Sequence, residues 1–231
     1  MLVGPQNLAV RVNHVRSRIH RAASDAGREA AAVTLIAVSK SKPAESIAAA
    51  AAAGITDFGE NYLQEALSKM DALPVEKTLS WHFIGALQSN KTRAVAERFQ
   101  WVHSIDRLSV ARRLSEQRPF HAPALNLCIQ VAMVPEPTKG GVEPEQLPAL
   151  AAQIRGLPRV ALRGLMCVPP QQPDRASERA LFAGLRAQLE LLNRAGHSLD
   201  TLSMGMSGDF ESAIAEGATH VRIGTALFGR R

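Results

Sequence analysis

Aromatic residues and cysteines are scarce in this chain, and long apolar runs are missing from it. Aromatic residues make up 4% of the 231 residues, which argues against a surface for stacking the bases of a single-stranded nucleic acid. The two cysteines, Cys128 and Cys167, stand inside apolar runs without metal-ligand spacing, so we interpret them as small buried residues of a reducing compartment. No apolar run is long enough to cross a membrane. We therefore expect a cytoplasmic protein that binds neither membranes nor metals.

Acidic residues are outnumbered by basic ones, which raises the question of nucleic acid. The formal net charge is +6 and the sequence pI is about 9.9. The excess comes largely from arginines scattered along the chain, so we interpret it as a mildly basic surface and expect no nucleic-acid partner. A nucleic-acid binder would lose affinity steeply with added salt. Linkers and repeats of fixed period are also missing, and residues 1–231 are expected to form one domain.

The N-terminal segment NLAVRVNHVRSRIHRAASDAG is rich in arginine and has no acidic residue before Asp25. Such a composition is found in transit peptides. However, Leu8, Val12, Val15 and Ile19 recur at i, i+4, i+7 and i+11. This spacing predicts a helix that packs on the body of the protein.

Short apolar runs alternate with helical patterns along the rest of the chain. The predicted strands are Val33–Ser39, Ile55–Phe58, Leu79–Ile84, Trp101–His103, Leu125–Val131, Val160–Cys167, Thr201–Met204 and His220–Ile223. The predicted helices are Pro43–Ala53, Tyr62–Met70, Lys91–Phe99, Arg107–Glu116, Pro144–Arg155, Arg175–Ala195 and Asp209–Glu216. Eight strands separated by helices favour an α/β fold, a single (β/α)8 (TIM) barrel with an extra N-terminal helix. Functional groups of such a barrel lie at the C-terminal ends of the strands, and phosphate is often bound after strands seven and eight.

Lys40 ends the buried strand pattern VTLIAVSK. A lysine is almost never fully buried without a partner, and a lysine at a strand end often simply extends its amine into the loop. The functional alternative is an amine that forms a Schiff base with an aldehyde. Lys42, just before Pro43, is expected to face solvent.

Two segments near the C-terminus together predict a phosphate site. In LSMGMSGDFESAIAEG, Ser207 stands where the N-cap of the next helix is expected, which indicates an anion site or an ordinary capped helix. In HVRIGTALFG, Arg222 and Gly224 share one face of the eighth strand, and Gly224 with Thr225 can offer an N–H and a hydroxyl to a phosphate. An arginine that points into the barrel needs an acceptor, either a buried carboxylate such as Glu60 or a ligand atom.

Three further polar residues are ambiguous. Asn61 follows the second strand and is a candidate site residue, although Asn61 and Asn90 both precede helical patterns and could be helix caps. His82 lies inside the third strand, where a single histidine is more often a core residue satisfied by its neighbours.

The motifs AVSKSKP, FGENYLQE, WHFIGALQSNK, LRGLM and LSMGMSGDFESAIAEGATHVRIGTALFG resemble the pyridoxal 5′-phosphate (PLP) homeostasis proteins, in order from Val33 to Gly229. The fold of that family is similar to the N-terminal barrel of bacterial alanine racemase. The resemblance implies PLP as the cofactor, in a Schiff base with Lys40. Its other implied contacts are Ser207, Gly224 and Thr225 to the phosphate, Arg222 to the pyridine nitrogen, Asn61 near the ring and Met204 in the wall beside it. Ala132 and Ala86 stand where the family usually has asparagine and proline.

The resemblance further implies a protein that carries or buffers PLP inside the cell, with no catalytic residue. Arginine can donate to the pyridine nitrogen but does not support a pyridinium, and Tyr62 is the only tyrosine. The chain is also expected to lack the second domain from which alanine racemase takes a catalytic tyrosine. The alternatives left open are a weak PLP-dependent amino-acid racemase and a Schiff-base aldolase without cofactor. We expect a monomer that binds PLP, with the apo forms of PLP enzymes as candidate recipients.

Overall fold

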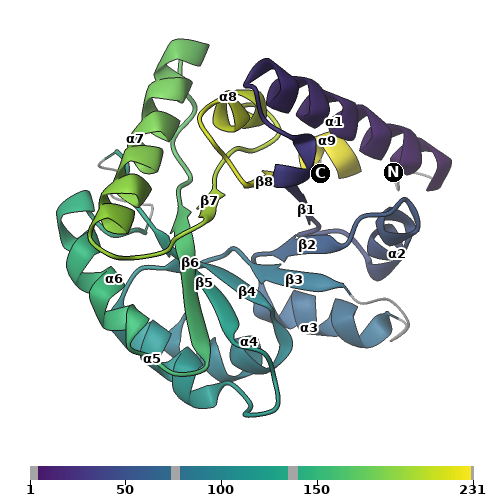
Figure 1. The fold of residues 1–231 in the computed structure, drawn as a ribbon. Helices are drawn as coiled ribbons and strands as arrows, with labels where there is room; N and C mark the ends of the chain where they lie inside the picture. Colours follow the sequence, from purple (N-terminus) through teal and green to yellow (C-terminus); the bar gives the residue numbers. More distant parts are fainter. Residues whose placement is uncertain (1–4, 74–78, 135–139, 230–231) are drawn as a thin grey trace.

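Eight parallel strands close into a barrel in the order β1 to β8 in the computed structural model, which describes residues 5–73, 79–134 and 140–229 (Figure 1). The strands are β1 (Thr34–Val38), β2 (Asp57–Glu60), β3 (Ser80–Phe83), β4 (Trp101–Ile105), β5 (Leu125–Gln130), β6 (Val160–Met166), β7 (Thr201–Ser203) and β8 (His220–Ile223). The pairing of β1 with β8 completes the ring. This confirms the predicted (β/α)8 barrel.

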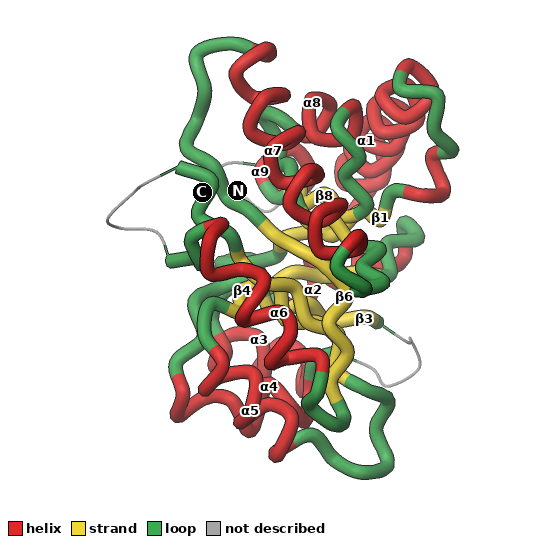
Figure 2. The backbone as a smooth tube through the Cα atoms, turned by 60° about the vertical axis from the view of Figure 1, so that its left-hand side comes forward, coloured by secondary structure: helices red, strands yellow, loops and turns green. Residues whose placement is uncertain are grey.

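Helices surround the barrel on its outside, and the strands occupy the middle of the molecule (Figure 2). The α-helices of the described ranges are α1 (Pro5–Asp25), α2 (Ala44–Ala52), α3 (Leu63–Ala72), α4 (Thr92–Arg98), α5 (Leu108–Gln117), α6 (Leu147–Arg155), α7 (Arg175–Arg194), α8 (Phe210–Ala215) and α9 (Thr225–Phe228). Short 3₁₀ helices are η1 (Ala30–Ala32), η2 (Ser89–Lys91) and η3 (Pro144–Gln146). Each strand is followed by an α-helix, and α1 is the additional helix at the N-terminus. No helix in this part of the chain is both long and apolar enough to cross a membrane.

The extra helix α1 packs along α8, α9 and α2 (Figure 1). Its predicted apolar stripe, Leu8, Val12, Val15 and Ile19, is buried as expected, and each such side chain contributes about 1.5–3 kcal/mol when fully buried. Arg18 adds a bidentate ion pair to Glu211 on α8, with both N–O distances 2.9 Å. The N-terminal helix is therefore held to the last elements of the barrel.

The position of β2 differs from the sequence-based prediction by two residues. The predicted strand was Ile55–Phe58, whereas the structure pairs Asp57 to Glu60 with β3. A Cβ atom on Gly59 would lie 3.0 Å from a side-chain atom of Ile36 and 3.1 Å from one of Ile84, so the packing favours glycine at this position. Glycine is not typical of strands, and the sequence pattern therefore did not predict this part of β2. The shift places Glu60 in the strand and Asn61 directly after it.

Buried apolar residues form two groups. Most belong to one cluster, which fills the layer between strands and helices; Val221 and Ile223 of β8 belong to it. Ile36, Cys128 and Met166 are buried but stand apart from this cluster. Because neighbouring strand residues point to opposite faces, Arg222 then faces the barrel interior, as predicted.

Both cysteines are buried and free. Burial raises the pKa of both thiols, that of Cys167 to about 12. They therefore behave as small core residues rather than nucleophiles.

Candidate functional site

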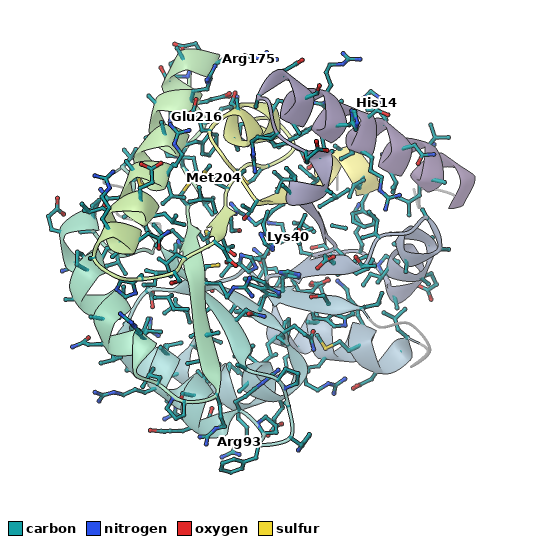
Figure 3. The ribbon with its side chains drawn as sticks, viewed as in Figure 1. His14, Lys40, Arg93, Arg175, Met204 and Glu216 are labelled. Carbon is teal, nitrogen blue, oxygen red and sulfur yellow. The ribbon has the colours of Figure 1, made fainter. Side chains whose placement is uncertain are left out.

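Lys40 lies two residues beyond the end of β1, at the C-terminal mouth of the barrel. Figure 3 shows it near the middle of the ring of strands (Figure 3). The residue is half-buried, and Ser41, which follows it, has a left-handed backbone with φ of 60°. The turn therefore places Lys40 at the edge at which TIM barrels bind their ligands.

A buried second lysine fixes this turn. Lys69 of α3 donates to the Ser39 carbonyl oxygen at 2.7 Å and to Oε1 of both Glu60 and Glu65 at 2.6 Å. Glu65 Oε1 also accepts from the backbone N–H of Ser41 at 2.5 Å. The two carboxylates near the turn are therefore paired with Lys69.

Glu60 is consequently not the acceptor for Arg222, and that candidate partner was wrong. Burial raises the pKa of Glu60, against the hydrogen bonds from Lys69 and Ser39 that lower it. Sequence analysis missed Lys69, although its i, i+4 spacing from Glu65 on one helix face was a usable signal.

Arg222 is held inside the barrel by two acceptors. Its side chain donates from Nη1 to Ser203 Oγ and from Nη2 to the Cys167 carbonyl oxygen, both at 2.8 Å. The residue is 4% exposed, and burial lowers its pKa. No carboxylate accepts from it among the described residues. Its other N–H donors remain for a ligand atom, the second acceptor that the sequence suggested.

The loops after β7 and β8 meet through Ser207. Its Oγ accepts a hydrogen bond from the backbone N–H of Ala226 at 3.3 Å, at the start of α9. The prediction that Ser207 caps the next helix is wrong: α8 begins at Phe210 with Asp209 at the N-cap, and Asp209 Oδ1 instead accepts from the Met206 N–H at 2.5 Å. The structure thus brings Ser207 to the segment that follows β8.

Gly224 and Thr225 lie beside this junction. Gly224 is the N-cap of α9, and a Cβ atom there would lie 3.3 Å from the Val38 carbonyl oxygen. Thr225 is exposed. A hydroxyl group and backbone N–H groups are therefore available at the barrel mouth for an anion.

Asn61 carries an unusual polar atom. Its Oδ1 is buried and has no hydrogen-bond partner within residues 5–73, 79–134 and 140–229, which is costly unless a ligand or water supplies a donor. The N-cap of α3 is Tyr62 and that of α4 is Lys91, so neither Asn61 nor Asn90 has the predicted capping role. A Cβ on Gly85 would lie 2.2 Å from the Asn61 carbonyl oxygen, so this glycine permits the close approach of the two loops.

Two other sequence candidates are fully buried. Met204 follows β7 and belongs to the apolar cluster (Figure 3), and its place in the wall beside the ring stays a prediction. His82 is fully buried and has hydrogen-bond partners in Asp57 and His103. It is the satisfied core histidine that the sequence favoured.

Known proteins are similar to this chain over nearly its whole length. The family model for the N-terminal domain of alanine racemase matches residues 10–231. Pyridoxal phosphate homeostasis protein from Pseudomonas aeruginosa is 57% identical over 97% of this chain and 96% of that protein. The protein of the same name from Escherichia coli K12 is 46% identical, over 97% of each chain.

Solved structures agree with these matches. The structure of PipY from Synechococcus elongatus PCC7942 with PLP bound has a TM-score of 0.86 and 40% identity, and the match covers 96% of this chain and 100% of PipY. An alanine racemase from Clostridium difficile has a TM-score of 0.74 at 13% identity, covering 98% of this chain and 57% of that one, which shows the shared barrel alone. The chain is a member of the pyridoxal phosphate homeostasis protein family, built on the barrel of the alanine racemase N-terminal domain.

Proposed function

We propose that this protein binds PLP through a Schiff base to Lys40 and carries or buffers it inside the cell. The observation that carries the proposal is the position of Lys40, at the barrel mouth on a turn whose carboxylates are already paired with Lys69. Among the residues that the structure describes, no ion pair holds Lys40, so the reaction of its amine breaks none there. The names of the relatives and the PLP-bound structure of PipY support the same ligand.

The surrounding residues fit the remaining groups of the molecule. Ser207, Gly224 and Thr225 would hold the phosphate, and the free donors of Arg222 would face the pyridine nitrogen. The unpartnered Oδ1 of Asn61 would accept from a donor near the ring. When bound, PLP supplies an aldehyde that condenses with amines and a ring that withdraws electrons.

We infer that the protein acts without catalysing a reaction on amino acids. A guanidinium does not release its proton in proteins, so Arg222 can donate to the ring nitrogen but cannot support a pyridinium. Tyr62, the only tyrosine, is 58% exposed at the start of α3. The shared barrel with alanine racemase keeps weak racemase activity as the second candidate. Solvent deuterium exchange at the α-carbon of amino acids tests it, and exchange at an enzyme-like rate would overturn the carrier function.

The remaining expectations follow from a carrier role. The free, buried cysteines fit a reducing compartment such as the cytoplasm. We propose that the protein acts as a monomer and that apo forms of PLP enzymes receive its ligand.

The Lys40→Ala substitution tests the covalent link. We expect the purified wild-type protein, loaded with PLP, to show a Schiff-base absorbance band that borohydride removes, and Lys40→Ala to lack the band. Lys42→Ala is the matched control, since Lys42 lies two residues further along the same turn, and it should keep the band. A full band in Lys40→Ala would place the link on another amine.

A further inference from the structure

A column of polar side chains crosses the interior of the barrel, where branched apolar residues usually fill the space. Asp57 Oδ1 lies 3.0 Å from His82 Nε2, and His82 Nδ1 lies 2.9 Å from His103 Nε2. His103 Nδ1 lies 2.8 Å from Ser203 Oγ, which accepts from Arg222 at 2.8 Å. His82, His103 and Ser203 are 0% exposed. The column therefore joins the first residue of β2, at one end of the barrel, to Arg222 near the ligand end.

The direction of every hydrogen bond in this column follows from the chemistry of its two ends. An ionised carboxylate only accepts, and the pKa of Asp57 is lowered by its hydrogen bond with His82, against burial. His82 must therefore donate from Nε2. Burial lowers the pKa of His82, so the ring is neutral and its Nδ1 is an acceptor.

The same reasoning passes to the next links. His103 must donate from Nε2 to His82, and burial lowers its pKa far enough to keep it neutral, so its Nδ1 accepts. Ser203 then donates its hydroxyl proton to His103 and keeps its lone pairs for Arg222. Because a guanidinium only donates, these hydrogen-bond directions agree with the chemistry of both Arg222 and Asp57. All donors point from Arg222 towards Asp57.

We propose that Asp57, His82, His103 and Ser203 are positioning residues, which hold the Arg222 guanidinium towards the ring nitrogen of the bound ligand. The inference rests on the proposed function. A protonated guanidinium does not pass a proton on, so the role of the column is to orient Arg222. The aligned hydrogen bonds of the column also stabilise the positive charge of Arg222, because they end on the Asp57 carboxylate. Arg222 has no direct carboxylate partner among the described residues, and this column is its connection to one.

The first test reads the tautomers directly in the apoprotein. In ¹⁵N–¹H spectra of histidine-labelled protein at neutral pH, His82 and His103 should both be neutral with the proton on Nε2. A proton on Nδ1 of either ring, or an imidazolium, would reverse or break the chain and overturn the inference. This measurement needs no ligand, so it stands even if the protein fails to bind PLP.

The second test measures the effect on the ligand. Ser203→Ala removes the link to Arg222, and we expect the dissociation constant for PLP to rise about fivefold, together with a shift of the absorbance maximum of the bound form. His220→Phe is the matched control: its ring centroid lies 6.1 Å from those of both His82 and His103, while its Nδ1 bonds to Thr219. It should change neither quantity.

An analogue of PLP with carbon in place of the ring nitrogen isolates the role of Arg222. Wild type and Ser203→Ala should bind this analogue equally, because it has no nitrogen to accept from the guanidinium. Equal losses of PLP affinity in Ser203→Ala and His220→Phe, or none in Ser203→Ala, would show that the column does not position Arg222.

Discussion

Lys40, just after β1, and Lys69 of α3, whose amine reaches the Ser39 carbonyl oxygen, show how surroundings decide the role of a residue. Lys69 is buried, and three oxygens accept from its ammonium group. Removing one partner of such a buried cluster costs about 3–5 kcal/mol of stability, so Lys69 has a structural role. Lys40, on the turn that this cluster fixes, is half-buried at the mouth. It is the lysine that remains available for chemistry.

Ser207 and Thr225 are the side chains that we assign to the phosphate. The double variant Ser207→Ala, Thr225→Ala should raise the dissociation constant for PLP at least about a hundredfold, because hydrogen bonds to a charged group contribute about 1.5–3 kcal/mol each. Fluorescence or absorbance titration of the apoprotein measures the change. Pyridoxal, which has no phosphate, is the control ligand and should bind both proteins alike; unchanged PLP affinity would remove these residues from the site.

Sequence analysis predicted the candidate site residues because most of them follow a strand end, where barrels bind ligands; Arg222, inside β8, is the exception. It could not locate the interior column, since His103 and Ser203 are 100 residues apart and lie in strands that give no polar pattern. The capping role of Ser207 was wrong for a related reason. Its partner, the N–H of Ala226, comes from the next strand-helix unit.

At the scale of elements, the loop between β7 and α8 depends on one glycine. Gly205 has φ of +93°, and a Cβ atom there would lie 2.7 Å from Ala213 Cβ and 2.9 Å from Phe210 Cα. Gly205→Ala should therefore lower the free energy of unfolding by about 2–4 kcal/mol, from backbone strain and overpacking together. Urea unfolding measures it.

Gly208 provides the matched control in the same loop. A Cβ atom on Gly208 would have nothing within 4 Å, so Gly208→Ala should change stability by less than about 0.5 kcal/mol. Equal stability of the two variants would show that the loop adapts to the extra methyl group of Gly205→Ala.

The packing of α1 can be tested on the same helix with two valines. Val15 is fully buried, whereas Val10 is 68% exposed. Val15→Ala should lower the free energy of unfolding by about 2 kcal/mol, from lost burial and the cavity left behind. Val10→Ala removes the same atoms and should leave stability nearly unchanged. Similar losses in both variants would contradict this packing.

The elements themselves were largely predictable because helix and strand periods differ. All eight predicted strands are present, and the spacing of Leu8 to Ile19 correctly predicted α1. Errors occurred where polar or small residues enter a strand. The polar Ser104 interrupts the apolar pattern, so the prediction missed the last two residues of β4. Gly59 and Glu60 did the same at the end of β2.

For the whole molecule, the buried histidines predict a loss of stability in mild acid. Burial lowers the pKa of His82, His103 and His220, that of His220 to about 4. The unfolded chain, with histidine pKa values of about 6.5, then binds protons that the folded chain does not. The stability contribution is fully present above that pH and is lost as the pH falls towards the folded-state values.

Urea unfolding at pH 7 and pH 5.5 measures this effect. His220, whose pKa is lowered to about 4 in the folded protein, should cost about 1 kcal/mol over that interval, and His82 and His103 should add to the loss. His220→Phe should reduce the difference by about 1 kcal/mol. A free energy of unfolding that is the same at both pH values would mean that these rings take up protons in the folded protein as readily as in the unfolded chain.

The attachment of α1 to α8 and α9 has a consequence for biosynthesis. The helix at Pro5–Asp25 leaves the ribosome well before Phe210–Ala215 and Thr225–Phe228, on which it packs. At a synthesis rate of about 5–20 residues per second, the apolar stripe of α1 lacks its packing partners for about 10–40 s. During translation, this helix therefore exposes an apolar surface on which a chaperone can bind until the last elements emerge.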